Sequence, residues 1–266
     1  MNKLSVTLIT LNEEANIERC IKSLSFAQEI IVVDSLSSDK TVEIAERNGA
    51  KVYTKKFEGY GQQKNYAASL CQNEWVLNID ADEEISPELA KNIQEILKNP
   101  TCDAYTLSRL TQFCGKWIYH GGWYPDNIVR LAKKNKSFWT TPQVHEKLIL
   151  KKEGNIGKLH GHLLHYSFPS FESQVKTNLK YAKLAGEILA TTKKICILSL
   201  LIRPFIKFIE CYLIKKGFLD GVHGLVIALN ASYSQFMKYA FAYFRQKDKS
   251  RIKNKKINIR SGSTCR

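Results

Sequence analysis

The sequence predicts an α/β fold: a mostly parallel central sheet flanked by helices, followed by a basic helical C-terminal region. Short apolar runs alternate with helical patterns through residues 1–110. These runs are nearly continuous, as expected of parallel strands that helices cover on both faces. From Phe171 onward the pattern becomes helical and rich in Lys and Arg. The 266 residues suffice for one large domain, or for one domain with a substantial appendage.

The predicted strands and helices alternate in order along the chain. Ser5–Leu11 is a strand candidate, and the apolar residues after it recur at the spacing of an amphipathic helix: Ile17, Cys20, Ile21 and Leu24. Glu29–Asp34 is a continuous apolar strand that ends in a carboxylate. Further strands are expected at 51–54 and 75–79, and further helices at 41–48, 61–71 and 86–97. The last helix begins with Ser86-Pro87, and proline favours the first helical position.

The net charge of +15 is confined to the last third of the chain. Residues 1–175 hold 21 Lys or Arg and 21 Asp or Glu, whereas residues 176–266 hold 19 and 4. A neutral first part argues against a nucleic-acid-binding core. The distribution instead indicates a conventional domain that carries a basic, surface-seeking appendage.

Cysteine usage and hydropathy indicate a cytoplasmic protein without a membrane-spanning helix. The seven cysteines are scattered and form no CxxC pair, which is typical of a reduced compartment. The apolar run Leu4–Leu11 is only eight residues long and alternates Ser and Thr with Val, Leu and Ile, so it fits a buried strand and not a signal peptide. The apolar run 195–202 ends at Arg203-Pro204, and the uncharged run 221–237 contains His, Asn and Ser, so neither fits a bilayer span.

Polar side chains follow the predicted strands where each strand ends. Thr10, Asn12 and Glu14 follow the first strand, Asp34 closes the second, and Asp80-Ala81-Asp82 follows the strand WVLNI. Ligands of parallel α/β sheets gather at the carboxyl ends of the strands. We therefore expect a binding site at this edge of the sheet.

The Asp80-Ala81-Asp82 motif has two interpretations. Two carboxylates two residues apart at a strand end can share one face and bind a hard divalent cation, which would in turn hold a diphosphate. Alternatively, acidic residues after a strand cap the next helix, a role that Glu83, Glu84 or Ser86 could also fill.

The residues around Asp34 and Lys64 suit a nucleotide but also have simpler explanations. A carboxylate at Asp34 can accept from a base N–H or a ribose hydroxyl, and Lys64 could reach a nucleotide. The hydroxyl-rich segment after Asp34 is also ordinary turn and capping chemistry, and Lys64 could lie on a solvated helix face.

Three blocks in residues 4–90 resemble inverting family 2 glycosyltransferases, which have the GT-A (Rossmann-like) fold: VTLITLNEEANIERCIKSL, IIVVDSLSSDKTVEIAERNGAKV and GYGQQKNYAASLCQNEWVLNIDADEEISPEL. The resemblance implies a nucleotide-sugar donor and Mg²⁺ or Mn²⁺. It places Asn12 and Glu14 beside the nucleotide and Asp34 on the uracil, and Thr10, at the end of the same strand as Asn12, is expected to bind the donor with them. It also places Lys64 near the nucleotide and makes Asp80 and Asp82 the metal–diphosphate motif.

The second half is similar to the bacterial enzymes of this family that glucosylate the inner-core heptose of lipopolysaccharide by a β-1,4 linkage. The similar segments are DNIVRL at 126–131, QVHEK at 143–147, LHYSF at 164–168 and 217–239. This resemblance implies transfer of a hexose, with UDP-glucose as donor, to a heptose of a lipid-linked core. The alternative acceptors are polyprenyl phosphate and another surface polysaccharide. A basic membrane- or nucleic-acid-binding protein is the non-enzyme alternative.

An inverting transfer needs one carboxylate that takes the proton of the acceptor hydroxyl. Many family members carry an acidic residue, often as Glu-Asp, where this chain has His145-Glu146. We expect Glu146 to be this base, with His145 as the lesser candidate. His165 is expected as a further metal ligand or as a contact to the diphosphate.

The predicted domain organisation follows from these assignments. Residues 1–170 form the GT-A domain, with the donor site in about 4–110 and acceptor-side loops in about 111–170. Residues 171–266 form the basic helical region, expected to bind an anionic inner-membrane surface on its cytoplasmic face as a peripheral protein. The expected partners are the nucleotide sugar and a glycolipid acceptor, and no nucleic acid.

Overall fold

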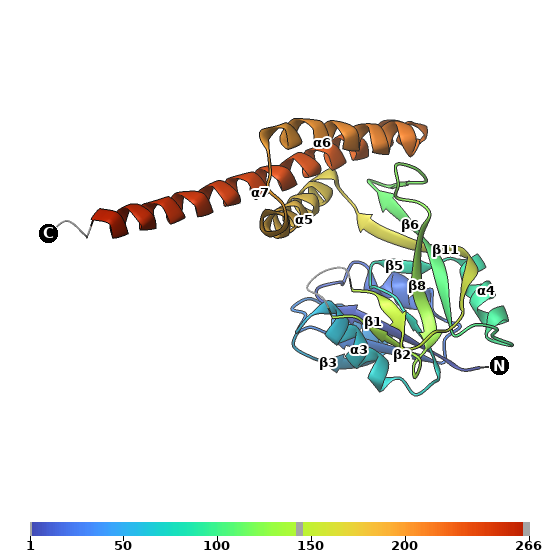
Figure 1. Cartoon of the computed structure of the whole chain (residues 1–266). Helices are drawn as coiled ribbons and strands as arrows, with labels where there is room; N and C mark the ends of the chain where they lie inside the picture. Colours follow the sequence, from blue (N-terminus) through green and yellow to red (C-terminus); the bar gives the residue numbers. More distant parts are fainter. Residues whose placement is uncertain (1, 142–145, 263–266) are drawn as a thin grey trace. The chain divides into compact units, whose positions relative to one another are not determined.

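The structure is a computed structural model that describes residues 2–141 and 146–262. The chain divides into two compact units (Figure 1). The first comprises Met1–Gln112 and Tyr124–Ser167, and the second comprises Phe113–Trp123 and Phe168–Arg266.

The first unit is built on a mixed sheet whose order is β3-β2-β1-β4-β8-β6-β11-β5. Four strands run parallel to their neighbours: β3 (Lys51–Thr54), β2 (Glu29–Asp34), β1 (Leu4–Thr10) and β4 (Trp75–Asn78). Antiparallel pairing joins β8 (Asp126–Lys133) to β4 and β6 (Ala104–Phe113), and β5 (Glu83–Ile85) to β11 (Ile156–Phe168). A separate antiparallel pair is formed by β9 (Ser137–Trp139) and β10 (Leu148–Leu150).

Helices cover both faces of the parallel strands, as the continuous apolar runs predict. Val32 packs with α1 (Ile17–Lys22) and α4 (Pro87–Ile96) in one core cluster. Its neighbours Ile31 and Val33 point the other way and pack against α3 (Tyr60–Leu70). The remaining helix of this unit is α2 (Thr41–Arg47). The predicted α/β class and its order of strands and helices are therefore confirmed.

The strand ends bring distant segments to one edge of the sheet. Thr10 and Asp34 are register partners at the ends of β1 and β2, and β4, which pairs with β1 on the other side, ends at Asn78. Asp80 follows Asn78 after one residue. Polar residues 10, 34 and 80 therefore meet at the carboxyl edge of the parallel strands.

The second unit is helical. It contains the short strand β7 (Lys116–Trp117), the helices α5 (Phe171–Thr192), α6 (Ile197–Ile209) and α7 (Val222–Gly262), a π-helical turn at Glu210–Ile214 and a 3-10 turn at Gly217–Asp220. α5 and α7 pack closely at Gly186, where a Cβ atom would lie 2.7 Å from the carbonyl oxygen of Lys238. Among the described helices, none offers an apolar stretch long enough to cross a bilayer.

Candidate functional site

The carboxylate of Asp34 organises the edge between β1 and β2. Asp34 is 1% exposed and accepts a 2.9 Å hydrogen bond from the Thr10 hydroxyl and a 2.8 Å bond from the Ser37 backbone N–H. Asn12 and Glu14 join the loop after β1 to the loop after β2. Their side chains accept hydrogen bonds from the backbone N–H groups of Ser38 and Lys40, at 2.9 and 3.1 Å. These predicted donor-site residues are thus brought together, and here they hold the two loops in place.

A network of ion pairs surrounds the first carboxylate of the DAD motif. Lys64 Nζ lies 3.0 Å from Asp80 Oδ1 and 3.1 Å from Glu146 Oε1. Arg130 Nη2 lies 2.7 Å from Asp80 Oδ2 and 3.0 Å from Glu83 Oε1. The Lys64, Arg130 and Glu83 side chains are almost fully buried. The network joins residues from α3, β8, β5 and the segment before β10.

The network perturbs the pKa of its members in opposite directions. Burial alone would raise the pKa of Asp80, but Arg130 and Lys64 hold it far below its usual value. Burial opposes the charge of Arg130 as well, yet Asp80 and Glu83 keep its pKa raised. Asp80 is therefore ionised throughout the physiological pH range.

Trp139 forms one wall of this network. The Lys64 ammonium lies 4.4 Å from the centroid of the Trp139 ring, within the range of a cation–π contact. The Trp139 indole N–H donates to Asn78 Oδ1 at 3.0 Å, and its backbone N–H donates to Asn65 Oδ1 at 2.8 Å. β4 thus holds the indole, and α3 holds the backbone of Trp139.

The second carboxylate of the motif has a different partner. His165 Nε2 lies 3.1 Å from Asp82 Oδ2, and His165 Nδ1 lies 3.4 Å from the Thr111 hydroxyl. The pairing of β11 with β5 positions His165, since its register partner is Glu83. The carboxylates of Asp80 and Asp82 thus have separate partners, Lys64 and Arg130 for the first and His165 for the second.

Asp82 and His165 suit a cation that shares its coordination with a bound phosphate. Residues 2–141 and 146–262 contain no group of three His, Cys, Asp or Glu that could hold a metal on its own. Negative charge nevertheless gathers beside Asp82: burial raises the pKa of Glu13, and the carboxylates of Asp82, Asp39 and Asp80 raise it further against the hydrogen bond from Asn16. A divalent cation here would take protein ligands from Asp82 and His165 and complete its shell with phosphate oxygens and water.

Of the two candidate bases, Glu146 and His145, the structure describes only Glu146. Glu146 is 18% exposed and contacts Lys64, so it lies within the Asp80 network. His145 falls outside the described residues.

Sequence reasoning missed Arg130 and Glu83 as members of the site, whereas Trp139 lies in the acceptor-side loops expected at about 111–170. Arg130 interrupts the apolar run of β8, and a cation inside a strand with a buried neighbour such as Leu131 needs a buried partner. That signal points to an ion pair but does not identify Asp80 as the partner. Glu83 does not cap α4, because Ser86 accepts from the Leu89 N–H and performs that role.

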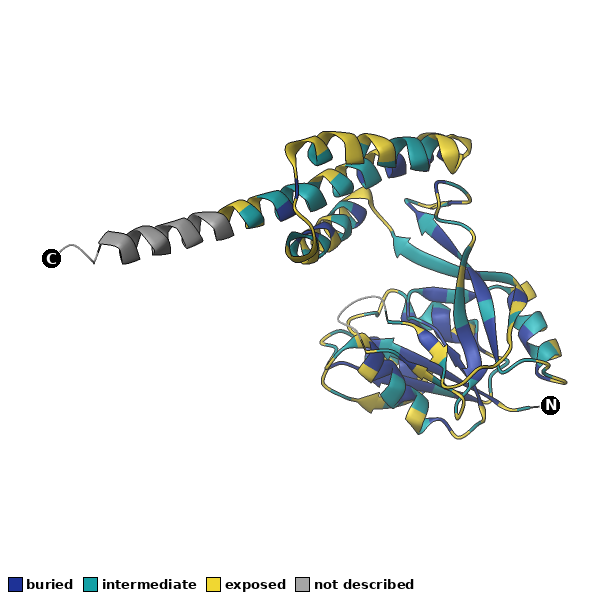
Figure 2. Cartoon of the chain, in the orientation of Figure 1, coloured by how far each residue is buried: buried dark blue, intermediate teal, exposed yellow. Residues whose placement is uncertain are grey.

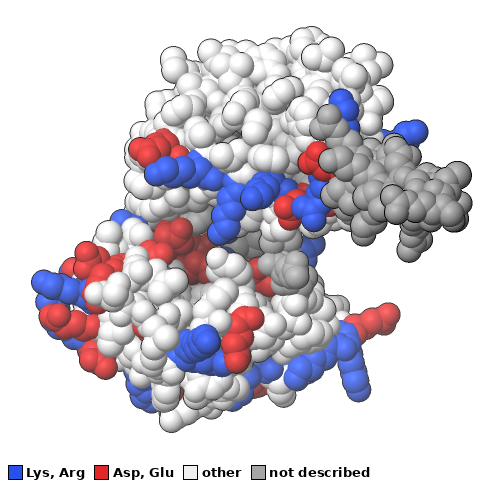
Figure 3. All heavy atoms as spheres, turned by 90° about the vertical axis from the view of Figure 1, so that its left-hand side faces the viewer, with Lys and Arg blue, Asp and Glu red and all other residues white. Residues whose placement is uncertain are grey.

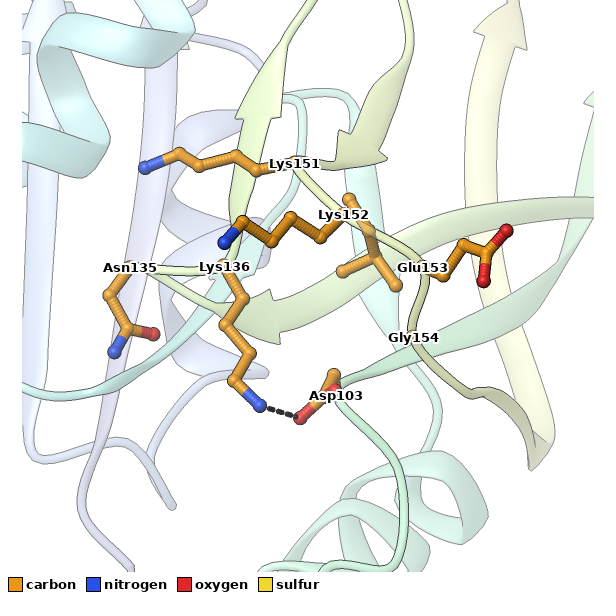
Figure 4. Close-up of a pocket in the computed structure, with 8 residues that line it drawn as sticks. Asp103, Asn135, Lys136, Lys151, Lys152, Glu153 and Gly154 are labelled. Carbon is orange, nitrogen blue, oxygen red and sulfur yellow. Dashed lines mark hydrogen bonds and ion pairs between the residues drawn. The ribbon is translucent and has the colours of Figure 1, made fainter.

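A separate cavity of about 250 Å³ lies at the other end of β4. Figure 4 shows Lys151 and Lys152 at its wall and Lys136 bonded to Asp103 at 2.8 Å. Lys133, three residues before Lys136, is the register partner of Trp75 at the start of β4. Asp80 follows the opposite end of that strand. This cavity is therefore separate from the Asp80 network.

Comparison with known proteins adds three findings. Residues 5–172 match the profile of Glycosyl transferase family 2. The chain is 36% identical over 252 residues to an uncharacterized glycosyltransferase of Rickettsia typhi, covering 90% of this chain and 86% of the relative. It is 29% identical over 262 residues to the lipopolysaccharide core biosynthesis glycosyltransferase LpsC of Rhizobium meliloti, covering 93% and 94%.

Among solved structures, the Staphylococcus aureus TarS fragment 1–349 in complex with UDP-GlcNAc is similar to this chain. The TM-score is 0.45 and the identity 17%, with 92% of each chain covered.

Proposed function

The chain belongs to glycosyl transferase family 2, and on that premise we propose that it transfers a hexose from a UDP-sugar, with inversion, to a lipid-linked saccharide. The observation that supports this proposal best is the position of Lys64 between Asp80 and Glu146. One ammonium contacts both the first carboxylate of the diphosphate motif and the proposed base. The groups proposed for the leaving diphosphate and for the acceptor proton thus belong to one connected site, so that a single bound hexose can reach both.

In the proposed donor site, the nucleotide lies along the edge formed by Thr10, Asn12, Glu14 and Asp34. Asp34 is nearly buried, so its part in uracil recognition would depend on the loops that it fixes through Ser37 and Thr10. Lys64 and Arg130 supply positive charge beside Asp80, at the expected place of the diphosphate.

The proposed cofactor is Mg²⁺ or Mn²⁺ on Asp82 and His165. When bound, the cation would neutralise the negative charge of the diphosphate and so make it a better leaving group. The 3.1 Å separation of Asp82 Oδ2 and His165 Nε2 puts two donor atoms side by side for this purpose.

In the proposed chemical step, a Glu146 carboxylate oxygen takes the proton of the acceptor hydroxyl. The hydroxyl oxygen forms a bond to the anomeric carbon of the hexose as the bond from that carbon to the diphosphate oxygen breaks on the opposite face. The diphosphate leaves with the bonding electron pair, which inverts the anomeric configuration. Lys64, released from Glu146, remains available to the departing phosphate.

The proposed acceptor is a heptose of the lipopolysaccharide inner core, and the proposed donor is UDP-glucose. The similarity to a relative named for lipopolysaccharide core biosynthesis supports this choice. We further propose that the basic C-terminal region binds the anionic cytoplasmic face of the inner membrane, where a glycolipid acceptor would be located. Polyprenyl phosphate or another surface polysaccharide is the competing acceptor.

Transfer assays with three acceptors test this proposal. The full chain with UDP-glucose and Mn²⁺ is incubated with a lipid A–core fragment ending in heptose, with a polyprenyl phosphate, and with no acceptor. The proposal predicts a mass increase of one hexose on the heptose acceptor alone. An increase on polyprenyl phosphate alone would assign the second function.

A further inference from the structure

Helix α6 carries an exposed apolar surface that no described element covers. The helix has no buried residue, although nine of its 13 residues are Ile, Leu or Phe. Figure 2 shows α6 drawn largely as exposed. We define the α6 face as its six most exposed apolar side chains: Ile197, Leu198, Leu201, Ile202, Phe205 and Ile206.

The spacing of these residues makes one continuous stripe. They recur at i, i+1, i+4, i+5, i+8 and i+9, which on a helix covers an arc of about 180°. Their exposed fractions range from 44% to 67%. The opposite side of the helix faces α7, where the Ser232 hydroxyl donates to the carbonyl oxygen of Pro204. The packing of α6 on its own unit therefore leaves the stripe free.

Lys and Arg residues flank the α6 face in the sequence. Residues 193–216 hold six Lys or Arg and one Glu, a net charge of +5. The one acidic residue, Glu210, forms ion pairs with Lys207 and Lys215. Lys193 and Lys194 precede the helix, and Lys215 and Lys216 follow it. Figure 3 shows a wide uncharged surface on the helical unit, with Lys and Arg and some Asp and Glu along one margin.

From this pattern we infer that the α6 face inserts into the interface of an anionic lipid bilayer and is the main membrane anchor of the protein. An apolar stripe with cations beside it matches a helix that lies in the membrane plane. A second copy of the chain is a poorer occupant, because a twofold interface over this face would bring the two sets of cations together. The inference rests on the proposed function, since a lipid-linked acceptor brings the enzyme to a bilayer.

The inferred anchor has a distinct salt response. Attraction between exposed charges and lipid head groups is screened beyond about 8 Å at physiological ionic strength. Burial of Leu, Ile and Phe side chains in lipid is not screened by salt. We therefore expect a substantial share of vesicle binding to persist at high salt, and this share to depend on the α6 face.

The test is vesicle sedimentation of the full chain with phosphatidylglycerol–phosphatidylethanolamine vesicles at low and high salt. The variant Leu201→Gln/Phe205→Gln replaces two side chains that are 66% and 67% exposed, so folding should be unaffected. Its matched control is Ile149→Gln/Ile156→Gln, which changes two exposed apolar residues of the first unit. We expect the first variant to bind about tenfold more weakly or worse at high salt, and the control to bind as the parent does.

Three outcomes would overturn the inference: unchanged binding of Leu201→Gln/Phe205→Gln, an equal loss in the control, or a dimeric parent that this variant makes monomeric without loss of vesicle binding. Stabilisation by UDP and Mn²⁺ is measured without vesicles on the same proteins. If it is present while vesicle binding fails, only the inference is wrong. If it is absent, the proposed donor site is wrong whatever the vesicles show.

Discussion

Arg130 is ion-paired to Asp80 across 50 positions of sequence, with Nη2 2.7 Å from Oδ2. The two aspartates of the DAD motif have different partners. Asp80 faces two buried cations, Lys64 and Arg130, whereas Asp82 faces His165. We therefore expect the two aspartates to affect stability and metal binding differently.

Replacing Asp80 by Asn should lower stability and flatten its dependence on acid. The pKa of Asp80 is lower in the folded chain than in the unfolded chain, so its contribution is present at neutral pH and is lost as pH falls below about 4. Because Asp80 is 29% exposed, we expect Asp80→Asn to reduce the free energy of unfolding at pH 7 by about 1–3 kcal/mol. Urea unfolding between pH 7 and pH 3 measures both effects.

Glu153→Gln controls for the change in net charge, because it neutralises an exposed carboxylate away from the network. The control should unfold as the parent does at each pH. An Asp80→Asn protein as stable as the parent at pH 7 would show that the ion pairs contribute nothing net.

The metal-dependent part of donor binding should depend on Asp82 and His165. UDP with Mn²⁺ at 100 times its dissociation constant should stabilise the parent by about 2.7 kcal/mol. Asp82→Asn and His165→Ala should each remove the increment that Mn²⁺ adds over UDP alone, and Asp80→Asn should weaken it less. Thermal unfolding with UDP, with and without Mn²⁺, provides the measurement, with Glu46→Gln as the control on the exposed side of α2. If Mn²⁺ stabilised Asp82→Asn and His165→Ala as much as it stabilises the parent, these residues would not be the metal ligands.

A methyl group at Gly61 should disturb the segment that leads to Glu146. A Cβ atom at Gly61 would lie 2.1 Å from the carbonyl oxygen of Thr140, so this backbone would have to move. We expect Gly61→Ala to lower turnover about tenfold or more, because a displacement of about 1 Å can cost that much, while UDP binding is retained. Gln62→Ala, on the exposed side of the same helix, is the control. Parental turnover in Gly61→Ala would show that this close contact has no role in positioning Glu146.

Neutralising the basic end of α7 should weaken vesicle binding mainly at low salt. The residues to change to Gln are Lys247, Lys249, Arg251, Lys253, Lys255 and Lys256. Salt screens the attraction between these side chains and anionic lipids, so this attraction contributes mainly at low salt, and the loss is expected there. The fraction of protein that stays bound at high salt should be unchanged. Transfer to a short soluble acceptor should also stay near the parental rate. Loss of the salt-resistant fraction would assign the anchor to this segment rather than to α6.

The fold was largely predictable because its signals are local. Strands β1, β2 and β4 are apolar runs, and alternate residues such as Val32 and Val33 pack into the cores on opposite faces of the sheet. Ser86-Pro87 begins α4 as its capping chemistry predicts. The association of Phe113–Trp123 with the helical unit was not predictable, since it depends on contacts distant in sequence such as the 2.8 Å bond from the His120 N–H to Asp220.

The candidate site was predictable in its location but not in its pairing. Asp34, Asp80 and Asp82 lie at or just after the ends of strands, which predicts that they share the carboxyl edge of the sheet. The partners Arg130 and His165 come from β8 and β11, and a single sequence carries no signal for which carboxylate each one meets.

Turnover of Glu146→Gln tests the central claim, inverting hexosyl transfer with Glu146 as the base, most directly. The substitution keeps the shape of the side chain and removes its ability to take a proton. UDP-glucose turnover on the heptose acceptor should fall by about 10²–10⁴, while stabilisation by UDP and Mn²⁺ stays at the parental level. Turnover close to that of the parent, with UDP binding intact, would contradict the account and move the proton transfer to another residue.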